Sequence, residues 1–152
     1  YRRTGRGGYV TEIAGRDLPR PLLTSIGRLS AEKGHADFID ALAILASRGQ
    51  RVSAILIGDG PERPRLEARI RDHGLHASVF LPGYLDQPQR VLEETDLAVL
   101  PSHSEGLPNA ALEAMAMGVP VVTTSRSAPR FQTSSERPRT SCRRSQCGSA
   151  RR

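Results

Sequence analysis

Short apolar runs alternate along the middle of the chain with segments whose apolar residues recur at a helical spacing. The apolar runs contain few polar residues and are bounded by Gly or Pro, which is typical of strands covered on both faces of a sheet. Strands are predicted at residues 22–26, 52–57, 79–81, 97–100 and 121–123, and helices at residues 35–48, 62–73, 88–94 and 108–117. Such alternation predicts an α/β domain with a doubly wound parallel sheet and helices on both faces.

The two ends of the chain lack this pattern. Residues 1–21 are rich in Arg and Gly and contain Pro19 and Pro21, so an irregular lead-in is expected there. Residues 126–152 hold many Arg, Ser and Pro and almost no large apolar side chain. Such a segment cannot bury enough apolar surface to offset the entropy lost on ordering, so it is expected to be disordered. The folded domain is therefore expected to occupy residues 22–125.

Length and net charge indicate the size of the fold but do not identify a ligand. The chain has 152 residues and a net charge of +6, and this length suits one domain with one core. The basic excess lies in the two ends, while the middle is mildly acidic, so the net charge says nothing about a site. Nucleic-acid binding through the Arg-rich tail is kept as an alternative, expected to be weak, salt-sensitive and blind to sequence. No specific nucleic-acid partner is predicted.

The sequence shows no sign of a transmembrane segment, a signal peptide or a zinc site. No apolar stretch has the length of a transmembrane segment and no signal peptide is seen, so a cytoplasmic location is expected. Cys142 and Cys147 form a C-x4-C pair in the basic tail, without the second Cys or His pair that a zinc site needs. No metal site is predicted.

The loop after the first predicted strand reads SIGRLSAEKG. In doubly wound sheets the ligand lies beyond the carboxyl ends of the strands, which is where this loop falls. Gly27 permits a tight turn, Arg28 and Lys33 supply two cations, and Gly34 permits close approach at the start of a helix whose N–H groups favour an anion. The loop indicates a diphosphate clamp. The alternative is two solvated surface cations.

The loop after the fourth predicted strand reads PSHSEGLPNAALEAMAMGVPVV. Glu105 lies in the loop, Gly106 would let a ligand approach the backbone, and the amides near Asn109 lie at a helix N-terminus that favours anions. Glu113 lies in a largely apolar helix, where its carboxylate needs partners such as sugar hydroxyls. The alternatives are a helix-capping role for Glu105 and an ordinary salt bridge for Glu113. His103 is given no role.

Together with the intervening segments IGDGP and VFLPGY, these two loops resemble family 4 of the retaining glycosyltransferases, also called glycosyl transferases group 1. The resemblance covers about residues 22–125. It implies a Rossmann-like domain that forms the C-terminal, nucleotide-sugar-binding half of a GT-B fold. The N-terminal acceptor-binding domain is not seen, so the chain is expected to be a fragment that binds the donor without transferring sugar by itself.

The resemblance also implies roles for individual residues. Arg28 and Lys33 would hold the donor diphosphate, and Glu105 would meet the hydroxyls of the donor sugar; these three are the candidate catalytic residues. Glu113 would hold the ribose hydroxyls. The base would be read near Pro82, Gly83 and Tyr84. The remaining residues expected to line the donor site are Gly27, Gly58, Gly60, Gly83, Gly106, Leu107 and Asn109.

The family implied by this resemblance needs no metal ion and no cofactor. The sequence agrees in having no D-x-D pair and no evident Ser-His-Asp or Cys-His set. The donor would be a nucleotide-diphosphate sugar. The acceptor would be a sugar, a lipid or a small molecule, and the sequence does not say which. Peripheral association of the full-length enzyme with a membrane is left open. The alternative is a non-catalytic nucleotide-sugar or phosphate-binding module. The loss of the family pattern after Ser125 suggests a shifted reading frame.

Overall fold

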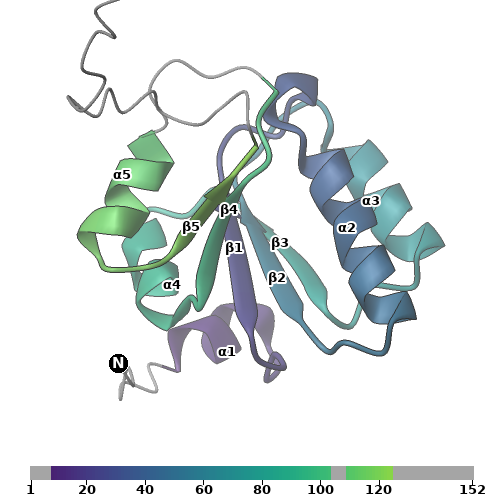
Figure 1. The fold of residues 1–152 in the computed structure, drawn as a ribbon, viewed down its shortest axis with the longest axis horizontal. Helices are drawn as coiled ribbons and strands as arrows, with labels where there is room; N and C mark the ends of the chain where they lie inside the picture. Colours follow the sequence, from purple (N-terminus) through teal and green to yellow (C-terminus); the bar gives the residue numbers. More distant parts are fainter. Residues whose placement is uncertain (1–7, 104–108, 125–152) are drawn as a thin grey trace, which may run out of the picture.

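A five-stranded sheet with strand order β3-β2-β1-β4-β5 organises the computed structural model, which describes residues 8–103 and 109–124 (Figure 1). The strands are β1 (Leu22–Ile26), β2 (Ser53–Ile57), β3 (Val79–Gly83), β4 (Leu97–Leu100) and β5 (Val121–Thr123). Every neighbouring pair is parallel. The chain runs outward from β1 through β2 to β3 and then crosses back to β4. This reversal beside β1 is the switch point at which such sheets bind ligands.

Helices cover both faces of the sheet, as Figure 1 shows. On one side lie α2 (His35–Ser47) and α3 (Arg63–Asp72), and on the other α1 (Tyr9–Ala14), α4 (Pro88–Glu94) and α5 (Asn109–Ala116). A single 3-10 turn, Ala31–Lys33, joins β1 to α2. The predicted α/β fold class is confirmed, and the predicted elements agree with the observed ones to within about two residues at each described end.

Burial explains the order of the strands. Every residue of β2 is buried, and so are Leu22 to Ser25 of β1. Side chains of β2 alternate between the two faces: Leu56 joins the core under α2 and α3, and Ile55 joins the core on the α1 and α4 side. A strand with two buried faces must be apolar throughout, which is the pattern that predicted it.

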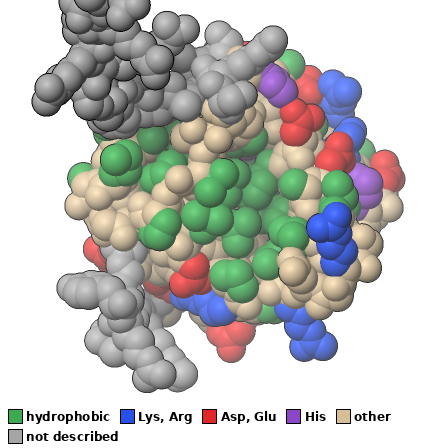
Figure 2. Space-filling view, viewed as in Figure 1, with side chains coloured by type: hydrophobic (Ala, Val, Ile, Leu, Met, Phe, Trp, Pro, Cys, Tyr) green, Lys and Arg blue, Asp and Glu red, His purple; other side chains and the backbone are tan. Residues whose placement is uncertain are grey.

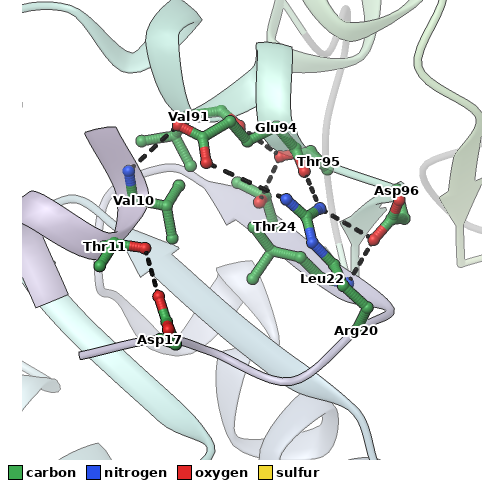
Figure 3. A network of polar contacts seen from close by, with 10 residues as sticks. All are labelled: Val10, Thr11, Asp17, Arg20, Leu22, Thr24, Val91, Glu94, Thr95 and Asp96. Carbon is green, nitrogen blue, oxygen red and sulfur yellow. Dashed lines mark hydrogen bonds and ion pairs between the residues drawn. The ribbon is translucent and has the colours of Figure 1, made fainter. Parts of the chain in front are cut away.

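The lead-in was expected to be irregular, and this prediction is wrong for residues 9–14, which form α1. Its Val10 is 4% exposed, and the Val10 amide donates to Glu94 Oε1 at 3.1 Å (Figure 3). Arg20 extends the same network by bonding to Asp96 at 3.0 Å and to the Glu94 carbonyl. The helix has only six residues, too few for a helical period to stand out, and contacts distant in sequence hold it.

Strand β5 forms one edge of the sheet, and apolar surface is exposed there. Val122 is 52% exposed, and in the register of the sheet it lies beside Val99 of β4. Figure 2 shows hydrophobic side chains gathered in the middle of this view, with most of the charged side chains toward the α2 and α3 side. Among the described residues, helices α2 and α3 shield the centre of the sheet and its β3 side from solvent, whereas the β5 edge is less well covered.

Candidate functional site

The loops after β1 and β2 interlock through their backbones at the carboxyl edge of the sheet. The Leu29 amide donates to the Asp59 carbonyl at 3.0 Å, and the Glu62 amide donates to the Leu29 carbonyl at 3.0 Å. The Leu29 side chain is fully buried. A Cβ placed on Gly60 would lie 2.3 Å from the Leu29 carbonyl oxygen. Gly60 was predicted to line the donor site, and the structure gives it a packing role that explains the glycine without a ligand.

Three other predicted site glycines lie together at the ends of β1, β2 and β3. Gly58 has φ of 137°, and a Cβ on it would lie 2.0 Å from the Gly27 carbonyl oxygen. The Gly58 amide donates to the Gly83 carbonyl at 2.8 Å, while the Gly27 amide donates to the Ile57 carbonyl at 3.0 Å. The structure therefore brings Gly27, Gly58 and Gly83 together, and the missing side chain of Gly58 lets its backbone run close to that of Gly27.

The two predicted cations lie on the loop after β1. Arg28 is exposed. The Lys33 side chain extends back toward the start of the loop. Its Cδ lies 3.9 Å from the position that a Cβ on Gly27 would take. The pKa of Glu32 is below its usual value, first because Ser30 Oγ donates to its carboxylate at 2.6 Å and further because of the charges of Arg28 and Lys33. Both cations thus act on the same small region of the loop.

The start of α2 is packed against the loop after β4. Gly34 has φ of 65°, and a Cβ on it would lie 2.0 Å from the Pro101 carbonyl oxygen. The close approach predicted for Gly34 is therefore to protein backbone. The next residue, His35, is 3% exposed, and its Nδ1 has no hydrogen-bond partner within residues 8–103 and 109–124. Burial first, and then the charge of Lys33, lowers the pKa of His35 to about 4, so its ring is neutral at pH 7.

Helix α5 carries the second set of predicted residues. Asn109 and Glu113 are both exposed, whereas Ala111 and Ala114 face the core. The expectation that the Glu113 carboxylate needs a ligand to offset its burial is therefore wrong, because solvent reaches it. Helix α5 contacts β4 and β5, across the switch point from Gly58 and Gly83. The other predicted residues of this loop, Glu105, Gly106 and Leu107, lie outside the described residues.

Arg63 is a cation at this edge of the sheet that was not predicted from the sequence. Arg63 begins α3, and its Nη1 lies 3.3 Å from the position of a Cβ on Gly83. Its Nη2 donates to the Leu81 carbonyl at 2.9 Å, and its Nε bonds to Glu67 at 2.9 Å. The only signal in the sequence is the spacing of Arg63 and Glu67, which is common on any helix surface. Beside Gly83, the Tyr84 side chain is 78% exposed.

Two kinds of feature are absent from the described ranges. In residues 8–103 and 109–124, no group of three or more His, Cys, Asp or Glu side chains is placed to hold a metal ion. None of the helices in this part of the chain combines the length and the apolar composition of a membrane span. The predicted independence of metals stays a prediction.

The parallel sheet and its switch point define a Rossmann-like α/β domain of the kind found in GT-B glycosyltransferases. The family model of the glycosyl transferases group 1 matches residues 11–135. The chain therefore belongs to this family of glycosyltransferases, which confirms the resemblance seen in its loops. The match begins inside the expected lead-in, within α1, and extends beyond the end of β5.

Known relatives agree with this assignment. Alpha-D-kanosaminyltransferase from Streptomyces kanamyceticus is 38% identical over 105 residues, which span 68% of this chain and 27% of that protein. The chain thus spans about a quarter of the length of this relative. A structure of HepE from Anabaena in complex with UDP and glucose has a TM-score of 0.64 and 30% identity, covering 70% of this chain and 30% of that one.

For another solved structure, the likeness covers a larger share of the solved chain. The C-terminal domain of LpcC, a glycosyl transferase group 1 family protein from Francisella tularensis, has a TM-score of 0.65 and 26% identity, and the likeness covers 75% of this chain and 63% of that one. The likeness is thus to a domain that was solved by itself, and it agrees with the α/β fold described above.

Proposed function

We propose that this chain carries the donor-binding part of a retaining glycosyltransferase of family 4. The donor would be a nucleotide-diphosphate sugar, whose sugar the whole enzyme transfers to an acceptor hydroxyl. The observation that carries the proposal is the placement of Arg28 and Lys33 on one loop at the switch point, next to the clustered glycines 27, 58 and 83. Because HepE was solved with UDP, UDP is the first nucleotide to test.

In this proposal the two cations act on the leaving group. Transfer breaks the bond between sugar and phosphate, so negative charge grows on the diphosphate in the transition state. Arg28 would bind phosphate oxygens through its planar guanidinium, and Lys33 would act as a point charge. Cations held in place beforehand stabilise this developing charge more than they stabilise the bound substrate, which raises the rate.

Other residues would orient the donor. Glu105 would accept hydrogen bonds from the hydroxyls of the donor sugar and Glu113 from those of the ribose, and the amides of Gly106, Leu107 and Asn109 would face the phosphates. The exposure of Glu113 leaves its carboxylate free of desolvation cost before the ligand binds. No protein nucleophile is invoked, since the leaving phosphate would help to deprotonate the acceptor on the same face of the sugar.

The base would lie near Gly83 and Tyr84, where β3 ends. Gly83 has φ of 88° and is followed by an aromatic ring that is 78% exposed. An exposed ring at the end of a strand offers a surface on which a planar base can stack. Arg63, which lies against Gly83, would then border the base or the ribose.

Sugar transfer itself is proposed for a protein with the full length of the relatives, about a quarter of which this chain spans. Group 1 relatives such as the kanosaminyltransferase are several times longer than the matched region. Binding two substrates side by side makes their reaction effectively unimolecular, which is worth up to about 7–11 kcal/mol. The chain by itself is therefore expected to bind the donor nucleotide and not to transfer sugar at a measurable rate.

A comparison of UDP with uridine tests the proposal. Arg28→Ala and Lys33→Ala should each weaken UDP binding by about tenfold or more, since a hydrogen bond to a charged group contributes about 1.5–3 kcal/mol, while uridine binding should stay the same. Calorimetry measures the affinities for UDP and for uridine, and repeating it with EDTA tests whether binding needs a metal ion. The matched control is Arg51→Ala, which removes an exposed Arg near the amino end of β2. Equal loss of UDP and uridine binding would show that the pair does not clamp a diphosphate.

The alternative of a non-catalytic binding module is decided by a transfer assay. A longer version of this protein, carrying the rest of the length found in its relatives, should transfer sugar from the nucleotide sugar that it binds best. Tight donor binding with no turnover on any mixed acceptor would favour the binding module.

A further inference from the structure

The segment Pro101–His103, directly after β4, holds the backbone on both sides of Lys33. The His103 amide donates to the carbonyl of Glu32, the residue before Lys33, at 2.8 Å. The Pro101 carbonyl oxygen lies against Gly34, the residue after Lys33, where a Cβ would be only 2.0 Å away. The position of Lys33 in space is thus set by a segment that lies far away in the sequence.

The His103 side chain adds a second connection. Its Nε2 lies 3.1 Å from Asp37 Oδ2 on the first turn of α2, and also 3.4 Å from the position of a Cβ on Gly34. The imidazole therefore passes over Gly34 to reach the helix. The same segment is anchored to the sheet, because the Thr124 hydroxyl donates to the Ser102 carbonyl at 2.5 Å.

We propose that His103 is a positioning residue that fixes the 3-10 turn of Lys33 against α2 and the loop after β4, a role that rests on the proposed function of Lys33 as a phosphate ligand. A lysine side chain is long and flexible, so the backbone that carries it decides where its ammonium group can reach. Electrostatic stabilisation needs such a group to be in place before the ligand arrives. The His103–Asp37 pair limits the movement of the turn relative to the helix, and therefore the movement of the Lys33 ammonium group.

The exposure of the His103 and Asp37 side chains limits the loss of UDP affinity that their removal can cause. The His103 and Asp37 side chains are 49% and 65% exposed, and pairs this exposed contribute at most about 1 kcal/mol. His103→Ala and Asp37→Ala should each weaken UDP binding by about two- to fivefold. His103→Gln, whose amide can donate to Asp37 from nearly the same place, should recover most of the affinity. Uridine binding should not change, because the turn carries a phosphate ligand and no base contact.

The decisive measurement combines each variant with Lys33→Ala. If His103 acts through Lys33, then adding His103→Ala to Lys33→Ala costs no further affinity for UDP. His76→Ala, which removes an exposed His just before β3 at the opposite edge of the sheet, is the matched control and should bind as wild type. Thermal melting of every variant checks that the fold is kept, which is expected since both side chains are largely exposed.

The outcomes separate the two levels of the proposal. Wild-type chain that binds neither UDP nor any other nucleoside diphosphate would overturn the proposed function and this role with it. Wild-type chain that binds UDP while His103→Ala binds equally well would overturn the positioning role alone. Loss of affinity that adds to that of Lys33→Ala, or that appears equally with uridine, would also overturn it, because it would show a general structural effect.

Discussion

Replacement of Gly60 by Ala separates a packing role for this glycine from a ligand-binding one. The new Cβ would lie 2.3 Å from the Leu29 carbonyl oxygen, 2.7 Å from its carbonyl carbon and 2.9 Å from its amide nitrogen. Ordinary contacts to a Cβ begin near 3.4 Å, so one of the two backbones must move by about 1 Å. Leu29 is held by its amide, by its carbonyl and by a fully buried side chain, so it cannot yield easily.

The expected cost follows from the strain of overfilling a packed site. Such strain typically costs about 1–3 kcal/mol, which lowers the melting temperature by about 4–12 °C for a domain of this size. Because Arg28 precedes Leu29 directly, the displaced loop should also weaken UDP binding, by about tenfold if one charged hydrogen bond is lost.

Thermal melting without any ligand distinguishes a packing role of Gly60 from a ligand-binding role. If Gly60 served only to leave room for the donor, Gly60→Ala would melt as wild type and lose affinity alone. Gly8→Ala is the matched control, since Gly8 has φ of −72° and, apart from its chain neighbours, no atom of the described residues lies within 4 Å of the position of its Cβ. An unchanged melting temperature for Gly60→Ala, together with unchanged UDP binding, would refute the interlocked-loop argument.

Two further predictions concern stability. The pKa of His35 is lowered from 6.5 to about 4, so between these values the unfolded chain takes up a proton that the folded chain does not, and the free energy of unfolding should fall by about 3 kcal/mol as the pH drops from 6.5 to 4. Urea melts at several pH values should show this loss reduced in His35→Leu and kept in His76→Leu. Glu94→Ala should lower the free energy of unfolding by about 1–3 kcal/mol, because the buried Val10 amide loses its acceptor. Melts in urea at pH 7 measure this, with Asp86→Ala, an exposed carboxylate away from α1, as control. An unchanged midpoint for Glu94→Ala would show that α1 does not depend on Glu94.

The sheet and most helices could be predicted because their signals are local. The buried β2 reads as an unbroken apolar run, and Gly49, which has φ of 73°, follows the end of α2 as a glycine in this conformation commonly does. Helix α1 could not be predicted in the same way. Its six residues are held by Glu94 and by neighbours far along the chain, and such contacts leave no periodic trace in the sequence.

The candidate site was predictable by position more than by role. A loop after a strand of a parallel sheet can be located from the pattern, so Gly27, Arg28 and Lys33 were found. What each glycine contacts could not be read in advance, because the answer depends on which loops become neighbours. Gly34 and Gly60 turn out to pack against the carbonyls of Pro101 and Leu29. Glu113 was misjudged for a related reason, since Leu112 and Met115, the large apolar residues near it in sequence, are exposed as well, and Ala111 and Ala114 are the α5 residues that face the core.

The position of β1 in the sheet explains why its loop is suited to hold a charged ligand. Strand β1 lies between β2 and β4, so its loop has protein backbone on both sides. On the β2 side, Leu29 bonds to Asp59 and Glu62, and on the β4 side, Glu32 bonds to the amide of His103. Arg28 thus lies next to the first attachment and Lys33 next to the second. A loop at the edge of the sheet would have only one such neighbour, and its cations would have to be ordered by the ligand at the expense of binding free energy. The two attachments should therefore be separable by experiment: Gly60→Ala acts mainly on the Arg28 side, and His103→Ala acts on the Lys33 side.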